Sequence, residues 1–330
     1  MSAAEDPSGP GADGDSRALD GVGDPSALEV VEYTDPLCPW SWGAEPVLRL
    51  LRASLDPRVR VRRVMCVLFD EDDDPAPDPV AETAWYARYV ADISAHTGAP
   101  HAVRLSRVAA GSWPSSLVAK AAELQGDRVA DRVLRRLRET VFVLGEPADT
   151  LPLALAAARG VTGLDEARLA ADAASDAVRE RVRADRAEAR RPPPELLTVA
   201  DDSPHPGAAK ETADGGHRYA LPTLVLRVPG RRRAVPGWRS YHAYAAALAE
   251  LCPAALRTPE PLPAAEALEY HRTLTEPERR ALTRGTWPPA GAVRLETGNG
   301  PLWLHPEEAA ARPAAAPGAP AGVPAAPPVP

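Results

Sequence analysis

The stretch Thr34-Asp35-Pro36-Leu37-Cys38-Pro39-Trp40-Ser41-Trp42-Gly43 carries the most specific chemical signal in this chain. It follows Leu28 to Tyr33, a short apolar run with two β-branched valines that favours a buried strand. After it, apolar residues recur with helical spacing up to Leu55, and Asp56-Pro57 ends the pattern. The stretch is therefore predicted to be the turn from a strand into a helix that begins near Cys38.

This turn places Cys38 where a helix favours a thiolate. The first N–H groups of a helix have no intrahelical partner, and together with the positive end of the helix dipole they stabilise a charged sulfur. Pro39 suits an early helical position because its missing N–H would have had no partner there. We expect Cys38 to be a nucleophile with a pKa below the roughly 8.5 of a free cysteine. The alternative is a buried structural cysteine.

Asp35-Pro36-Leu37-Cys38-Pro39-Trp40-Ser41 resembles the active-site segment of DsbA-family oxidoreductases, in the branch that includes FrnE-like proteins. The resemblance implies an α/β thioredoxin fold with a large helical insertion, in which a cis-proline before a later strand packs against the active-site cysteine. Leu221-Pro222-Thr223 matches that proline, and Val235 to Tyr241 resembles the entry to the last helix. The likeness covers about residues 28 to 252. Without the resemblance, Pro222 would be an ordinary trans proline of an edge strand.

The chain departs from the family at Ser41, where redox-active members have the second cysteine of Cys-x-x-Cys. A serine forms no disulfide, but its hydroxyl can donate a hydrogen bond to the Cys38 thiolate. Exchange of a single thiol with a small thiol remains chemically open. The predicted site has Cys38 and Ser41 as catalytic residues, with Pro39, Trp40, Leu221 and Pro222 as supporting or substrate-binding residues and no metal.

The remaining patterns order the elements as strand, helix, strand, helical block, strand, strand, helix. Val59 to Phe69 is predicted to be the second strand, and a change of phase in its alternation allows a bulge. Residues 80 to 195 are helical almost throughout, Ala220 to Val228 returns to strand character with Arg232 to Val235 as its hairpin partner, and a last helix starts near Trp238. A right-handed crossover makes the first two strands parallel.

These patterns divide the chain into a thioredoxin-like domain with additions. The predicted segments are a disordered N-terminal segment (1–27), the thioredoxin-like domain (28–79 and 196–252), the inserted helical domain (80–195), a C-terminal extension (253–305) and a disordered Ala/Pro-rich tail (306–330). In the extension, Thr275 to Glu278 has capping-box spacing, and Gly298-Asn299-Gly300 separates two apolar runs like a hairpin turn. The sequence assigns the extension no function.

The other cysteines and the tryptophans leave alternatives open. Cys66 and Cys252 fit small buried hydrophobic positions, but Cys66 is also a candidate to resolve Cys38 if the two lie close. Trp40 is expected to be partly exposed beside the sulfur. Trp42 and Trp113 suit either a substrate groove or the seam between the two domains. Arg231 to Arg233 is interpreted as a solvated turn, with an anionic thiol cofactor as the alternative partner.

Composition limits the classes of partner. The chain has 330 residues, 45% hydrophobic and 25% charged, with a net charge of -8, which argues against nonspecific binding to nucleic acid or anionic lipid. Three cysteines are too few for a disulfide framework, and no apolar run of about 18 residues predicts a spanning helix. The acidic first 27 residues have neither the cationic start nor the apolar stretch that a secretory signal needs. We expect a cytoplasmic protein; its oligomeric state stays open.

Three functions compete at the sequence level. The leading hypothesis is an enzyme, a DsbA-like thiol-disulfide oxidoreductase or isomerase in which Cys38 attacks a disulfide- or thiol-containing substrate, protein or small molecule. It needs no tightly bound cofactor, only a low-molecular-weight thiol as co-substrate. The second is a thiol-dependent transferase or isomerase of the kappa-class or 2-hydroxychromene-2-carboxylate isomerase type. The third is a non-redox adaptor, because Asp-Pro-Leu-Cys-Pro followed by Trp42, Glu45 and Pro46 also resembles DsbA-like Clp-protease adaptors.

Overall fold

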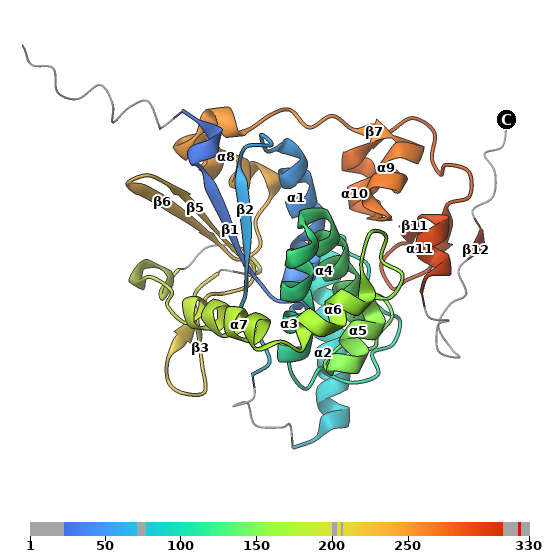
Figure 1. Ribbon diagram of the computed structural model, residues 1–330, viewed down its shortest axis with the longest axis horizontal. Coiled ribbons are helices and arrows are strands. Elements are labelled where there is room, and N and C mark those ends of the chain that lie inside the picture. Colours follow the sequence, from blue (N-terminus) through green and yellow to red (C-terminus); the bar gives the residue numbers. More distant parts are fainter. Residues whose placement is uncertain (1–22, 71–76, 200–202, 206, 313–322, 325–330) are drawn as a thin grey trace, which may run out of the picture.

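The computed structural model of this chain contains a four-stranded mixed sheet in the order β2-β1-β5-β6, on the left in Figure 1. β1 (Glu29–Thr34) runs parallel to β2 (Arg60–Met65) and antiparallel to β5 (Thr223–Val228), which forms a hairpin with β6 (Arg231–Pro236). The four strands follow one another along the chain as predicted, and the parallel β1–β2 pair and the β5–β6 hairpin confirm the two predicted pairings. The structure describes residues 23–70, 77–199, 203–205, 207–312 and 323–324.

Helices cover both faces of this sheet. α1 (Pro39–Ser54) makes the crossover from β1 to β2 and lies with α8 (Tyr241–Leu251) on one face, where a shared apolar cluster includes Leu48, Leu226 and Leu248. α7 (Asp176–Ala189) lies against the other face. α8 starts after the N-cap Ser240, whose hydroxyl accepts from Ala243 N–H.

The inserted block between β2 and β5 is helical, as predicted. Its helices pack around their own apolar core, which is rich in small residues of α3, α4 and α5. Figure 1 shows this block beside α1 and the sheet. The helices are α2 (Pro79–Thr97), α3 (Trp113–Ala122), α4 (Asp127–Phe142), α5 (Leu151–Ala158), α6 (Glu166–Ala173) and α7.

A small α/β unit follows α8. Its sheet has the order β12-β10-β11-β8, and β10 and β11 form the hairpin predicted around Asn299. Thr275 and Glu278 form the predicted capping box at the start of α10. The elements of this unit are α9 (Ala264–His271), β8 (Thr273–Thr275), α10 (Glu276–Leu282), β10 (Val293–Leu295), β11 (Leu302–Leu304), α11 (Pro306–Ala310) and β12 (Val323–Pro324).

Short segments complete the fold. They are η1 (Pro25–Ala27), η2 (Glu123–Gln125), η3 (Pro194–Leu196), η4 (Pro253–Ala255), β3 (Lys210–Glu211), β4 (His217–Arg218), β7 (Leu262–Pro263) and β9 (Thr283–Arg284). Within the described ranges, no helix is both long and apolar enough to cross a bilayer.

Both predicted tails include residues that the structure holds in place. Residues 306–312 were assigned to the disordered tail, yet α11 packs against the core, where Arg136 donates to buried Glu308 at 2.5 Å. At the other end, Asp24 caps η1 inside the predicted N-terminal segment. The apolar residues of this segment are too few to predict an ordered helix. Ion pairs such as Arg136–Glu308 hold α11 in place instead. β12, which pairs with β10, also falls within the predicted C-terminal tail, and only residues 1–22, 313–322 and 325–330 of the two tails lie outside the described residues.

The second strand does not form the bulge that its change of phase allows. The β1–β2 register is unbroken from Glu29↔Arg60 to Thr34↔Met65. The phase changes because β2 is an edge strand whose first half faces solvent, and Val61 there is 38% exposed. The strand ends at Met65, and Val67 has a φ of 52°.

Candidate functional site

Cys38 is the N-cap residue of α1, as the sequence predicts. Its sulfur accepts a hydrogen bond from the Ser41 N–H at 3.4 Å, and its carbonyl accepts from the Trp42 N–H at 3.0 Å. Pro39 occupies the first helical position, where a missing N–H costs nothing. The local rules of helix capping thus account for the position of the sulfur.

The loop before β5 contacts this sulfur. The Leu221–Pro222 peptide bond is cis, as predicted, and the Cys38 thiol lies 3.9 Å from the Leu221 carbonyl oxygen, which it approaches as a donor. Leu221 belongs to the same apolar cluster as Cys38 and Trp40. The fold therefore brings together all the residues that the sequence assigned to the site.

The site is sealed. Cys38 is only 4% exposed, and Ser41, Leu221 and Pro222 are buried as well. The expectation that Trp40 is partly exposed is wrong, because its side chain is 7% exposed. Its indole N–H donates to the Tyr89 hydroxyl at 2.7 Å, and its ring meets His205 edge-on at 4.9 Å between centroids. The sulfur and the side chains around it are thus buried in the described part of the chain.

Burial also reverses the predicted acidity. It raises the pKa of the Cys38 thiol above the ordinary value, and Asp35 adds to this, while the Ser41 hydroxyl and N–H and the more distant Arg218 oppose it. The Ser41 hydroxyl favours the thiolate, although its oxygen forms no hydrogen bond of standard geometry with any described residue. The prediction of a lowered pKa is wrong because removing the sulfur from water outweighs the donors at the helix end.

Asp35 organises the turn, a role that sequence reasoning missed. Its buried carboxylate accepts from the Leu37 and Leu68 N–H groups, each at 2.8 Å, and from the Ser112 hydroxyl at 3.0 Å. It thereby joins the β1–α1 turn, the chain after β2 and the start of α3. Burial raises its pKa to about 6. The signal was present in the sequence as an acidic residue between a buried strand and a proline.

The two remaining thiols are buried and free. Cys66 lies just after β2 in the Cys38 cluster, where its N–H donates to Thr34 at 2.9 Å and its thiol donates to Val64 at 3.4 Å. Cys252 packs in the cluster between α8 and the sheet. Both positions fit small buried hydrophobes. The structure contains no Cys38–Cys66 disulfide.

Trp42 and Trp113 lie at the seam between the sheet domain and the helical block, one of the two alternatives left open. The Trp42 indole donates to the Pro100 carbonyl at 2.7 Å, and its ring stacks on Phe142. Trp113 donates to Asp70 at 3.2 Å.

In the described part of the chain, no group of three or more His, Cys, Asp or Glu side chains is arranged to hold a metal ion.

Glu45 forms several ion pairs next to the Cys38 motif. It is buried in the middle of α1 and pairs with Arg138 of α4 and, at 2.7 Å, with Arg52. Arg138 also donates to the Thr34 hydroxyl at 2.6 Å. This cluster ties the helix that carries Cys38 to the helical block, and its carboxylate is not free for chemistry.

Comparison with known proteins agrees with this architecture. A family model described as Thioredoxin matches residues 32–191. The structure of a candidate protein disulfide isomerase from Nitrosomonas europaea superposes with a TM-score of 0.52 and 17% identity, over 68% of this chain and 96% of that one. This chain is a thioredoxin-fold protein. Its fold has the helical insertion of DsbA-like structures and an extra C-terminal region.

The curated relatives of this thioredoxin-fold protein are named as adaptors. It is 34% identical over 119 residues to the ClpXP adapter protein SpxH of Shouchella clausii, a match that covers 35% of this chain and 38% of the relative. It is 30% identical over 123 residues to SpxH of Halalkalibacterium halodurans, covering 35% and 39%. The chain thus spans less than two fifths of the length of these relatives.

Proposed function

We propose that this protein is a non-redox adaptor that keeps the DsbA-like fold and has lost its redox cycle. The observation that carries the proposal is the sealed thiol, since Cys38 is 4% exposed and burial raises its pKa. Reactive cysteines lie in partly exposed, electropositive surroundings that lower the thiol pKa, whereas buried ones are inert. Ser41, in addition, supplies no second sulfur.

The names of the curated relatives support a protein partner. Both are ClpXP adapter proteins, and both match this chain over about a third of its length. We propose that the chain brings a client protein to a ClpXP-type protease. In this proposal the thioredoxin-like part is a binding scaffold, and Cys38 packs as a small hydrophobic residue.

The leading hypothesis from sequence, a thiol-disulfide oxidoreductase, has less support at the site. Thiol exchange needs the attacking sulfur to meet the substrate sulfur in line, so it depends on access as well as on the thiolate fraction. Cys38 is 4% exposed, and Trp40 in the same apolar cluster is 7% exposed and held by Tyr89. This burial counts equally against a small thiol as co-substrate and against the transferase alternative.

A client-trapping experiment tests the proposal. ClpX and a proteolytically inactive ClpP from the same organism are incubated with its cell extract, with and without this chain, and proteins retained in the ClpP chamber are identified by mass spectrometry. We expect a defined set of proteins to be retained only when the chain is present. Cys38→Ser should retain the same set, and Cys252→Ser, which replaces another buried thiol, controls for packing effects.

Two results would overturn the adaptor proposal. The first is an unchanged set of retained proteins with and without the chain. The second is turnover of a disulfide substrate such as insulin by the wild type with a small thiol, lost in Cys38→Ser but kept in Cys252→Ser. That second result would return the oxidoreductase hypothesis to first place.

A further inference from the structure

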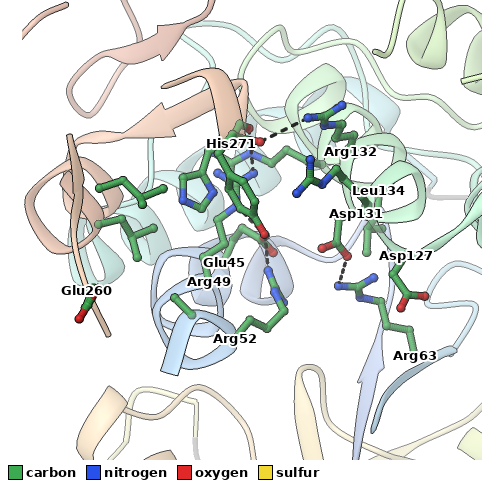
Figure 2. Close-up of a pocket in the computed structure, with 16 residues that line it drawn as sticks. Glu45, Arg49, Arg52, Arg63, Asp127, Asp131, Arg132, Leu134, Glu260 and His271 are labelled. Atoms are coloured by element: carbon green, nitrogen blue, oxygen red, sulfur yellow. Dashed lines mark hydrogen bonds and ion pairs between the residues drawn. The ribbon is translucent and has the colours of Figure 1, made fainter. Parts of the chain in front are cut away.

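A pocket of about 540 Å³ lies where α1, α4 and the C-terminal unit meet (Figure 2). α1 contributes Arg49 and Arg52 to its lining, α4 contributes Arg128 and Arg132, and the C-terminal unit contributes a group that includes His271. None of the residues assigned to the Cys38 site lines it. The adaptor proposal assigns this pocket no role.

Most of the arginines that line the pocket are neutralised. Arg52 pairs with Glu45 at 2.7 Å, Arg63 with Asp131 at 2.6 Å, and Arg135 with Glu278, a residue behind the wall, at 2.9 Å. Figure 2 shows the Arg63–Asp131 pair on the right of the pocket. These pairs build the wall and leave few donors for a ligand.

Arg128 and Arg132 differ from the other arginines, because within the described ranges neither forms an ion pair with a carboxylate. Arg132 donates only to backbone carbonyls, of Thr162 at 2.9 Å and Tyr270 at 3.4 Å. Arg128 lies over the Tyr270 ring, with 4.8 Å from its guanidinium carbon to the ring centroid. Asp127 and Glu260 also line the pocket, at opposite edges of the view in Figure 2.

Burial, and after it the nearby arginines, lowers the pKa of two groups that line the pocket. Burial and the cations of Arg49, Arg135 and Arg52 lower the pKa of His271 to about 2, although Glu45 opposes them. Burial, Arg272 and Arg128 lower the pKa of Arg132, opposed by Glu308 and Glu269. Uncompensated cations in a partly desolvated cleft attract an anion.

The rest of the wall is apolar. Leu134, Leu262 and Leu282 line the pocket together with the aromatic ring of Tyr270. Pockets for small molecules typically have about 300–1,000 Å³, with mostly apolar walls and a few convergent polar groups. This cavity falls within that range.

We propose that this pocket binds a small molecule with an apolar body and an anionic head, a carboxylate or a phosphate, which Arg128 and Arg132 hold. The three leucines and Tyr270 contact the body. The neutral imidazole of His271 offers one further hydrogen bond. The site spans α1, α4 and the C-terminal unit, so a bound ligand stabilises their contact.

Calorimetry with phenyl phosphate as the probe tests this proposal, with inorganic phosphate and the cation benzamidine for comparison. We expect phenyl phosphate to bind more tightly than inorganic phosphate because of the apolar wall, and benzamidine not to bind. Because a charge-assisted hydrogen bond is worth about 1.5–3 kcal/mol, Arg128→Gln and Arg132→Gln should each weaken binding about tenfold or more. Arg183→Gln, on the exposed side of α7, should leave it unchanged.

Arg128→Gln is the safer variant, since exposed Arg128 makes only the ring contact, whereas Arg132 also joins two backbone segments. The ring protons of His271 give an independent readout and should shift in NMR spectra on addition of phenyl phosphate. Equal binding of phenyl phosphate and benzamidine, or unweakened binding by Arg128→Gln, would overturn the proposal. Binding of an acidic peptide but not of phenyl phosphate would also overturn it, and would assign the pocket to a protein partner.

Discussion

Two opposing influences act on the thiol of Cys38. Donors and the dipole at a helix N-terminus stabilise a charge by about 0.3–1 kcal/mol at exposed sites and about 2 kcal/mol in favourable buried geometry. Taking an ion out of water costs several kcal/mol in a real protein interior. Burial therefore dominates at Cys38, and the balance raises its pKa.

The first prediction concerns the reactivity of this thiol. In the native protein, iodoacetamide should modify Cys38 at least tenfold more slowly than in urea-unfolded protein, because both the burial and the raised pKa disfavour an accessible thiolate. The rate of modification is followed by mass spectrometry against pH, and its midpoint should lie above the roughly 8.5 of a free cysteine. Fast modification near neutral pH would contradict the sealed site.

The second prediction concerns Asp35. Asp35→Asn should destabilise the protein by about 1–3 kcal/mol, because the amide NH₂ would meet one of the N–H groups that the carboxylate now accepts. The folded pKa of about 6 lies above the ordinary 3.8, so the contribution of Asp35 to stability is full below about pH 4 and is lost as the pH rises through 6.

The difference in stability between wild type and Asp35→Asn should therefore widen as the pH falls from about 7 to about 4. Urea unfolding at several pH values measures it. Glu180→Gln, at an exposed carboxylate of α7, is the control for replacing a carboxylate by an amide. A difference for Asp35→Asn that does not change with pH would show that Asp35 keeps an ordinary pKa in the fold.

The sequence could predict the position of the Cys38 sulfur but not its burial. Capping rules and the spacing of apolar residues fix Cys38 at the helix start, and the family resemblance supplied the cis bond at Pro222. Tyr89 and His205 close over Trp40 from segments that are far away in sequence and carry no motif. Only the three-dimensional packing reveals that Cys38 and Trp40 are buried.

At the scale of elements, α4 is buried on more than one side. The sequence predicts its apolar stripe, and Val133, Leu137 and Val141 are indeed buried. Its opposite side carries Arg135 and Arg138, which a sequence pattern would assign to solvent, yet both are buried against carboxylates of α1 and the C-terminal unit. The partners of these arginines are distant in sequence, so no local pattern identifies them.

The third prediction tests the link between α1 and α4. Breaking a buried ion pair by removing one partner costs about 3–5 kcal/mol, because it leaves the other charge buried alone. We expect Glu45→Gln and Arg138→Met each to lower the free energy of unfolding by about that amount. The double variant should lose less than the sum of the two, since the attraction between Glu45 and Arg138 is counted in both single losses but is lost only once.

Urea unfolding of the four proteins gives this double-mutant cycle. The exposed pair Arg183–Glu180 is the matched control, and its loss should cost less than about 1 kcal/mol. If the losses at Glu45 and Arg138 are additive, the two residues do not act as a pair and other members of the cluster hold the helices together.

At the scale of the whole molecule, the C-terminal unit is built into the core. Arg135 of α4 makes two parallel hydrogen bonds to Glu278, at 2.9 and 3.0 Å, and Arg49 of α1 donates to the Thr273 carbonyl at 2.7 Å. Arg312 pairs with Glu139 of α4. The sequence indicated the capping box and the hairpin of this unit because both are local. It could not indicate these docking contacts, because the two partners of each contact are far apart in the sequence.

The last prediction tests this docking through Glu278, whose carboxylate faces buried Arg135 and partly buried Arg49. Glu278→Gln keeps the size of the side chain and can still accept from the Thr275 N–H, but it leaves the charges of Arg135 and Arg49 without this partner. We expect a loss of about 3–5 kcal/mol. In hydrogen exchange followed by mass spectrometry, protection should fall in the C-terminal unit and in α4 together, while the β5–β6 hairpin keeps its protection. Loss of protection confined to α10 would mean that Glu278 serves only its own capping box. Protection lost evenly across the chain would mean that the C-terminal unit and the thioredoxin-like domain unfold as one cooperative body, with no separate docking step.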